Sequence, residues 1–107
     1  MRSAPLGMRA EKGTPPERAA SVLADLSRLA ESKVEIASCN GIDPLVKLLR
    51  STGDEGRTHA AMALFHLSTG GDNKYLITAE GAIPPLVRLL VIGTFEAKRY
   101  AAGTLWQ

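Results

Sequence analysis

Residues 82–90 read AIPPLVRLL, and residues 41–49, which lie 41 positions earlier, read GIDPLVKLL. Both stretches place proline directly before a run of leucine and valine, and the similarity continues beyond them. Between residues 42–66 and residues 83–107, 10 of 25 positions are identical without any gap. One offset that relates two segments of this length indicates an internal repeat, and an internal repeat decides the fold class.

A third segment follows the same offset. Residues 19–27, AASVLADLS, align with residues 60–68, AAMALFHLS, which lie 41 positions later. Alanine and leucine recur in these segments at spacings of three or four, which is the period of a helix that buries one face. A helical repeat of about 40–47 residues is typical of α-solenoids, in which neighbouring repeats stack and bury a continuous core.

The periodic pattern predicts helices in a rotation of long, short and medium lengths. Prolines in first turns, glycines at helix ends and the Asn40-Gly41 pair indicate the boundaries. Asp43 is expected to cap the helix that contains Pro44. The expected helices are at residues 17–30, 33–38, 44–50, 55–67, 73–79, 84–92 and 95–107.

The repeats also predict the organisation of the chain. Prolines and glycines interrupt any periodicity in residues 1–16, which we expect to be a flexible N-terminal tail. Residues 17–107 form the repeat segment. It comprises a third helix at residues 17–30, one full repeat at residues 33–69 and a second, incomplete repeat at residues 72–107.

The net charge of the chain is small and lies near its N-terminus. Residues 1–18 hold four Lys or Arg and two Asp or Glu, which gives +2, and residues 19–107 hold nine of each sign, which gives zero. The repeat segment therefore has no overall basic field to hold a phosphate backbone. A nucleic-acid binder or a membrane-surface binder is accordingly the less favoured class of function.

Cysteine content and hydropathy indicate the compartment. Cys39 is the single cysteine, so no intramolecular disulfide is possible. No apolar run approaches the ~20 residues that span a bilayer, and the N-terminus lacks the apolar stretch of a secretory signal. We therefore expect a cytoplasmic or nuclear protein.

Two sequence patterns carry a family resemblance. The stretch GAIPPLV at residues 81–87 and the pattern Ala-Ala-x-x-Leu at residues 19–23, 60–64 and 101–105 resemble the second and third helices of armadillo repeats. The resemblance implies an all-α, right-handed α-solenoid with three helices per repeat and about two and a quarter repeats. The Ala-Ala-Gly-x-Leu form at residues 101–105 is more similar to the beta-catenin, vacuolar-scaffold and plant ubiquitin-ligase branches than to importin-alpha.

The family resemblance also implies a concave groove lined by third helices. In importin-alpha, a tryptophan and an asparagine four residues later bind extended basic peptides in this groove. Neither residue type is present at the corresponding pairs, which are Ser21 with Asp25, Met62 with His66, and Gly103 with Gln107. Binding of nuclear-localisation signals in the importin manner is therefore not expected.

Residues one turn earlier extend the same rows, because Thr58 precedes Met62 by four positions and Arg99 precedes Gly103 by four. Such side chains would bond the main chain of an extended peptide. The candidate groove residues are Asp25, Thr58, Met62, His66, Arg99, Gly103 and Gln107. Trp106 aligns with Phe65, and we expect both side chains to pack between repeats.

The sequence carries no catalytic motif. His59 and His66 are seven residues apart, which does not suit a helical zinc pair, and no glycine-rich phosphate loop with lysine is present. We expect a non-catalytic protein-interaction module that needs no cofactor or metal and binds an extended segment of a protein partner. An alternative is the substrate-adaptor part of a larger ubiquitin ligase. The incomplete second repeat also suggests self-association through its C-terminal face.

Overall fold

The computed structural model describes residues 15–26, 30–51 and 53–107. The predicted tail at residues 1–16 lies outside the described residues, except for Pro15 and Pro16. These two prolines belong to the first turn of a helix, where the missing amide hydrogen of proline has no helical partner to lose.

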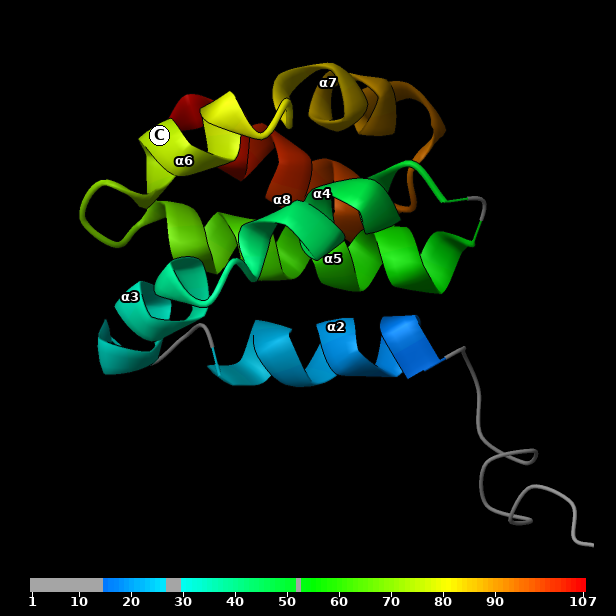
Figure 1. Ribbon diagram of the computed structural model, residues 1–107. Coiled ribbons are helices and arrows are strands. Elements are labelled where there is room, and N and C mark those ends of the chain that lie inside the picture. The colour runs from blue at the N-terminus through cyan, green and yellow to red at the C-terminus, as the bar shows by residue number, and fades with distance from the viewer. Residues whose placement is uncertain (1–14, 27–29, 52) are drawn as a thin grey trace, which may run out of the picture.

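The described residues form helices and no strand, which confirms the all-α prediction (Figure 1). The helices are α2 (Pro15–Leu26), α3 (Ala30–Ser38), α4 (Ile42–Leu49), α5 (Asp54–Ser68), α6 (Asn73–Ala79), α7 (Ile83–Ile92) and α8 (Phe95–Trp106). No single helix among them is long and apolar enough to cross a bilayer. Only α6 and α7 taken together, with an 85° bend between them, reach that length and composition.

Two three-helix units are stacked in the described part of the chain. Helices α3, α4 and α5 form the first unit, and α6, α7 and α8 form the second. The long helices α2, α5 and α8 pack side by side with α5 in the middle (Figure 1). Helix α4 packs on α5, and α7 packs on α8 in the same way. The predicted rotation of helix lengths holds in the second unit, whereas in the first unit α3 has 9 residues and α4 has 8.

The hydrophobic core runs between the stacked units. Helices α2, α5 and α8 contribute mainly alanines, and α4 and α7 contribute mainly leucine and valine. Small side chains let the long helices approach closely, while the larger side chains fill the remaining space at crystal-like density. The core residues with no exposed surface are Ala24, Ala60, Ala61, Ala63, Leu64, Leu67, Ala82, Leu86, Ala97 and Ala101.

The turn after each short helix is built in the same way in both units. Asn40 has φ 62° and Gly81, one period of 41 later, has φ 82°, so both adopt the left-handed conformation. The closing hydrogen bonds run from Gly41 N–H to Ile36 O at 2.9 Å and from Ala82 N–H to Ile77 O at 3.3 Å. This Schellman arrangement confirms the helix end predicted at Asn40-Gly41.

Two local predictions are wrong. Ala30, predicted to end the first helix, instead begins α3; helix α2 is described as far as Leu26, and residues 27–29 lie outside the described residues. Helix α3 was predicted only from residue 33, and it packs against α5 and α6. Asp43 lies inside α4 and does not cap it, because the helix begins one residue earlier. Its N-cap is Gly41, and the Asp43 carboxylate pairs with Lys47 at 3.3 Å.

Candidate functional site

One face of α5 stays accessible although helices pack on both of its flanks. Along this face lie Glu55, His59, Met62 and His66, at spacings of four, three and four residues. These spacings place the four side chains in one row on the helix surface. Glu55 is exposed and the other three are half-buried, so the row forms a surface that a ligand can reach.

The period of 41 carries this row to the two neighbouring long helices. We name the combined surface the third-helix stripe. It consists of Arg18, Ser21 and Asp25 on α2, Glu55, His59, Met62 and His66 on α5, and Glu96, Tyr100, Gly103 and Gln107 on α8. Five of the predicted groove residues belong to it, namely Asp25, Met62, His66, Gly103 and Gln107. All residues of the stripe are exposed or half-buried.

Aromatic rings lie on the stripe where α5 meets α8. The ring centroids of His66 and Tyr100 are 6.1 Å apart, and Phe65 lies 5.2 Å from His66 and 5.6 Å from Tyr100. The guanidinium carbon of Arg99 is 5.4 Å from the Tyr100 centroid, which is a cation–π distance. We name these four residues the aromatic cluster. Its mutual contacts hold the rings in place and leave His66 and Tyr100 half-exposed.

Gly103 allows the close approach of α5 and α8. A Cβ atom at this position would lie 2.6 Å from Cε1 of Phe65, so the phenyl ring occupies the space of a side chain. At the α2–α5 junction, the period places Met62 at the position of Gly103 and Ala24 at the position of Phe65. Helix α5 therefore supplies the bulky side chain at both junctions, Met62 towards α2 and Phe65 towards α8.

Thr58 lies in the α5–α8 junction and not on the stripe. Its side chain is only 7% exposed, and its hydroxyl donates to the Asp54 carbonyl at 2.7 Å. The Thr94 hydroxyl is 2.9 Å away and accepts from Ala97 N–H at 3.1 Å. Each hydroxyl has one hydrogen, so Thr94 donates to Thr58. Every hydrogen of this small network is used inside the protein.

A cavity of about 470 Å³ opens at the N-terminal ends of α5 and α8. Three carboxylates line it, from Asp54, Glu55 and Glu96, together with the exposed ring of Phe95. Asp54 accepts from Arg57 at 2.6 Å, and the Glu55 carboxylate lies 3.9 Å from Nε2 of His59. The helix dipole stabilises carboxylates at helix N-termini. These three carboxylates make this end of the stripe acidic.

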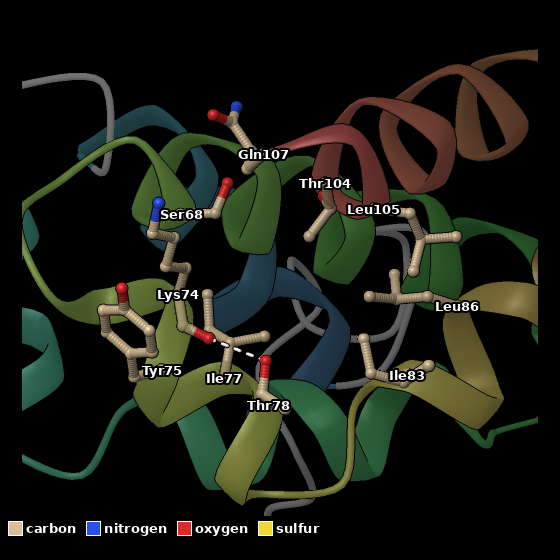
Figure 2. Close-up of a pocket in the computed structure, with 10 residues that line it drawn as sticks. All are labelled: Ser68, Lys74, Tyr75, Ile77, Thr78, Ile83, Leu86, Thr104, Leu105 and Gln107. Carbon is tan, nitrogen blue, oxygen red and sulfur yellow. Dashed lines mark hydrogen bonds between the residues drawn. The ribbon is translucent and has the colours of Figure 1, made fainter.

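A second cavity, of about 330 Å³, lies at the other end of the stripe between α6, α7 and the end of α8 (Figure 2). Gln107 connects it to the stripe. Three hydroxyls that line this cavity donate to helix carbonyls, from Ser68 to Phe65 O, from Thr78 to Lys74 O and from Thr104 to Tyr100 O. The side chains of Lys74 and Tyr75 also line it, together with the apolar side chains of Ile77, Ile83, Leu86 and Leu105.

The sequence of each stacked unit matches a known family. The description of that family is Armadillo/beta-catenin-like repeat, and it matches residues 30–69 and 72–107. The chain belongs to the armadillo repeat family. Helices α3–α5 and α6–α8 are accordingly two armadillo repeats, and α2, α5 and α8 are third helices.

Solved armadillo repeat proteins and an engineered protein have the same fold. The engineered protein is 34% identical, with a TM-score of 0.78 over 83% of this chain and 37% of its own. The designed armadillo repeat protein YIII(Dq)4CqI is 23% identical, with a TM-score of 0.78 over 84% of this chain and 39% of its own. The designed armadillo repeat protein YIII(Dq.V1)4CPAF in complex with peptide (KR)4 is 24% identical, with a TM-score of 0.75 over 83% and 38%.

This chain spans less than two fifths of the length of each of these three structures. No curated protein matches the chain. Within the described residues of the two armadillo repeats, no group of three or more His, Cys, Asp or Glu could hold a metal ion.

Sequence reasoning missed part of the third-helix stripe. Arg18, His59 and Tyr100 form its row one turn before Ser21, Met62 and Gly103, whereas the prediction used the row of Thr58 and Arg99. The available signal was the angle around the helix axis. Positions i, i+3 and i+7 span a narrower angle than positions i, i+4 and i+8, so they stay on a narrow accessible face. Arg99 is exposed and reaches the stripe through the ring of Tyr100.

Phe65 and Trp106 differ although they occupy matching positions in the two armadillo repeats. Phe65 packs between α5 and α8, as expected. The same expectation is wrong for Trp106, which is 89% exposed. In the described part of the chain, no helix lies against the side of α8 that corresponds to the α8-facing side of α5. Trp106 therefore occupies the sequence position of a residue that packs between two third helices, but the second of these helices is missing from the described residues.

Proposed function

We propose that this armadillo segment is a non-catalytic protein-interaction module that binds an extended segment of a protein partner along the third-helix stripe. The stripe crosses α2, α5 and α8 in order, so a peptide laid across it would contact successive repeats. The partner would be held through its main chain by polar side chains and through one flat or aliphatic side chain by the aromatic cluster.

The half-exposed rings of His66 and Tyr100, 6.1 Å apart, are the observation that carries this proposal. Aromatic side chains that are fixed by packing supply contact area at low entropic cost and are enriched at binding hot spots. Phe65 lies against both rings, and the guanidinium of Arg99 lies over the Tyr100 ring. A ring pair that is supported in this way offers a preorganised contact for a ligand.

The polar part of the stripe supports recognition of a peptide main chain. His59, His66 and Gln107 carry imidazole or amide groups that can form hydrogen bonds, and they lie at intervals along α5 and α8. A peptide backbone presents donors and acceptors in alternation, so amide and imidazole side chains can satisfy it without reading sequence.

Charge along the stripe predicts which partner residues are preferred at each position. Asp54, Glu55 and Glu96 surround the cavity at the N-terminal end of α5 and α8, whereas Arg18 and Arg99 lie farther along. The designed armadillo relative of 24% identity was solved with the peptide (KR)4. For this chain, we propose a mixed-charge segment that places one basic side chain over the acidic cavity and no continuous run of lysine and arginine.

This role requires no reaction, and we propose a cytoplasmic or nuclear location for it. The hydroxyls of Ser68, Thr78 and Thr104 in the second cavity donate to helix carbonyls. A protein partner in the same compartment would then determine the biological process in which the module acts.

Binding to an array of extended peptides tests the proposal. The labelled chain is compared with the double variant His66→Ala and Gln107→Ala, which removes two side chains of the stripe and leaves the core intact. Peptides that bind the natural chain should lose about 10-fold or more in affinity, because each substitution removes a hydrogen-bonding side chain at the ligand surface.

Glu80→Ala is the matched control, since Glu80 is exposed on the C-terminal turn of α6 and away from the stripe. This control should retain the binding profile of the natural chain. An unchanged profile for the double variant, with circular dichroism proving that it is folded, would overturn the assignment of the stripe.

A further inference from the structure

The side of α8 that faces away from α5 carries junction residues that are exposed. We name it the outer face of α8. Ala61 is fully buried and Phe65 packs against α8, whereas Ala102 and Trp106, one period later, are both exposed, Trp106 to 89%. Helix α7, which packs on α8, also carries exposed apolar side chains, among them Val87 and Leu90. Exposed apolar surface of this kind marks interaction sites.

The side of α2 that faces away from α5 also carries exposed apolar side chains. We name it the outer face of α2. Ala19, Val22 and Leu26 are exposed on it, Val22 to 57% and Leu26 to 43%. The residues one period later on α5 are fully buried, and they are Ala60, Ala63 and Leu67. The outer face of α2 therefore matches the face of α5 that is buried. On α5, that face packs against the third helix before it, which is α2.

We infer that two copies of this chain associate head to tail, with the outer face of α8 on one copy packed against the outer face of α2 on the other. The junctions between α2 and α5 and between α5 and α8 already use these two kinds of face. One chain carries an unoccupied example of each kind in its described residues. The intermolecular contact thus continues an interface that the fold repeats internally.

The register of the internal junction specifies what Trp106 would contact. At the α5–α8 junction, Phe65 occupies the space that a side chain on Gly103 would take. Moving this contact by one period replaces Phe65 with Trp106 and places Ser21 of the second copy at the position of Gly103. Serine is small and half-exposed here, so it leaves room for the larger indole ring. The bulky and small positions are therefore matched across the proposed contact.

The same register brings Arg18 of the second copy to the position of Tyr100. Phe65 lies 5.6 Å from Tyr100, and His66 lies 6.1 Å from it. After the shift, Trp106 and Gln107 would both be neighbours of Arg18. A guanidinium over an indole makes a cation–π contact, and a Gln side-chain carbonyl accepts from a guanidinium N–H. The contact is therefore apolar at its centre and polar on its stripe side.

This association is heterologous, because the two faces are different. A heterologous contact that does not close into a ring grows into an open series of oligomers. It would also align the third-helix stripes of consecutive copies, because Arg18, Ser21 and Asp25 would follow the stripe residues of α8. The test of this proposal is independent of peptide binding, since Val22 and Trp106 are not stripe residues and self-association is measured without a peptide.

Two variants that each damage one face test the inference. Val22→Asp alters the outer face of α2, and Trp106→Asp alters the outer face of α8; both positions are exposed, so the fold is retained. The natural chain should increase in mass with concentration in analytical ultracentrifugation, and its tryptophan emission should shift to the blue. Each variant alone should associate about 30-fold or more weakly, as expected for loss of a central interface contact.

An equimolar mixture of the two variants gives the decisive measurement. The Val22→Asp copy keeps an intact outer face of α8, and the Trp106→Asp copy keeps an intact outer face of α2. The mixture should therefore form heterodimers and stop there. Trp106 is the only tryptophan of the chain, so the blue shift in the mixture reports the Val22→Asp copy alone.

Val91→Asp is the matched control, because Val91 is 77% exposed on α7, outside the face that α2 would cover. It should associate like the natural chain. The inference is overturned if the natural chain stays monomeric up to about 1 mM, the range of the weakest specific complexes. It is equally overturned if the mixture forms no heterodimer. Full association of Val22→Asp alone, abolished by Val91→Asp, would instead establish pairing of two α7–α8 surfaces.

Discussion

The first armadillo repeat and the second have the same leucines and valine at matching positions of helices α4 and α7, yet some of these side chains differ in exposure. Val46 is 1% exposed and Val87, one period later, is 49% exposed. Leu49 and Leu90 differ in the same way, at 3% and 40%. The second repeat packs on the first, whereas the outer side of the second repeat is uncovered in the described part of the chain.

The difference separates two properties that a sequence pattern is often taken to give together. The pattern of apolar residues specifies which face of each helix is able to pack. Whether that face is buried depends on the presence of a neighbour, because apolar surface contributes to stability only when it is removed from water. Matched substitutions in the two repeats can therefore measure what a neighbour contributes.

The largest effect is expected for truncation of the matched leucines in α4 and α7. Leu49→Ala should lower the free energy of unfolding by about 2–5 kcal/mol, since it leaves a cavity in the core. Leu90→Ala should lower it by less than about 1 kcal/mol, because the Leu90 side chain is already partly hydrated. Urea denaturation followed by circular dichroism measures both values. Equal losses would mean that the outer face is covered in solution.

The junction between α5 and α8 can be converted into a copy of the junction between α2 and α5. Gly103→Met alone should destabilise the chain by about 1–3 kcal/mol, because its Cβ would collide with Phe65. Combined with Phe65→Ala, it reproduces the pair of Ala24 and Met62. The double variant should therefore lose less stability than the sum of the two single variants, by about 0.5–3 kcal/mol.

Additive losses of stability in this double-mutant cycle would contradict the idea that either residue of the junction pair can supply the bulky side chain. The same denaturation measurement supplies all four corners of the cycle.

A smaller effect is expected at the N-cap of α8, where the two repeats again differ. The Thr94 hydroxyl accepts from Ala97 N–H, while Gly53 at the matching position of α5 makes no side-chain cap. Thr94→Ala should cost about 1 kcal/mol of stability. Thr94→Gly, which copies the first repeat, should cost less at the cap itself, because glycine is tolerated there. A larger loss for Thr94→Gly than for Thr94→Ala would argue against the capping role.

The smallest effect is expected for the surface ion pair of α4. Lys47 lies 3.3 Å from Asp43, and both side chains are largely exposed, so Lys47→Ala should cost about 0.3–0.5 kcal/mol. Its counterpart Arg88 has the uncharged Pro84 four residues earlier, and Arg88→Ala should leave stability unchanged. High salt should remove the difference between these two variants. A difference that persists in high salt would require another cause.

The fold was predictable because a single offset of 41 residues relates three segments of the sequence. Helix α6 begins and ends where the sequence predicted, and the left-handed end at Asn40 is set by local turn chemistry. The sequence predicted separate helices at residues 17–30 and 33–38, but it did not predict that Ala30 belongs to the second of them. Packing of α3 on α5 and α6 decides it.

The candidate site was predictable only in part. Family resemblance led to Met62, His66, Gly103 and Gln107, which lie on the third-helix stripe. Thr58 has a polar side chain at helical spacing from Met62, yet its hydroxyl is consumed by Asp54 and Thr94. Helical spacing specifies a direction around the axis of one helix, whereas accessibility also depends on the helices packed beside it.

By itself, the sequence determined the all-helical repeat, its period of 41 residues and the faces that are able to pack, because these depend on local periodicity and turn chemistry. Only the tertiary structure decided that Phe65 is held against Gly103 while Trp106 is exposed, and that Tyr100 joins His66 on the stripe. The physical reason is that burial and mutual contact depend on pairs of helices, and a pattern within one helix does not contain its neighbour.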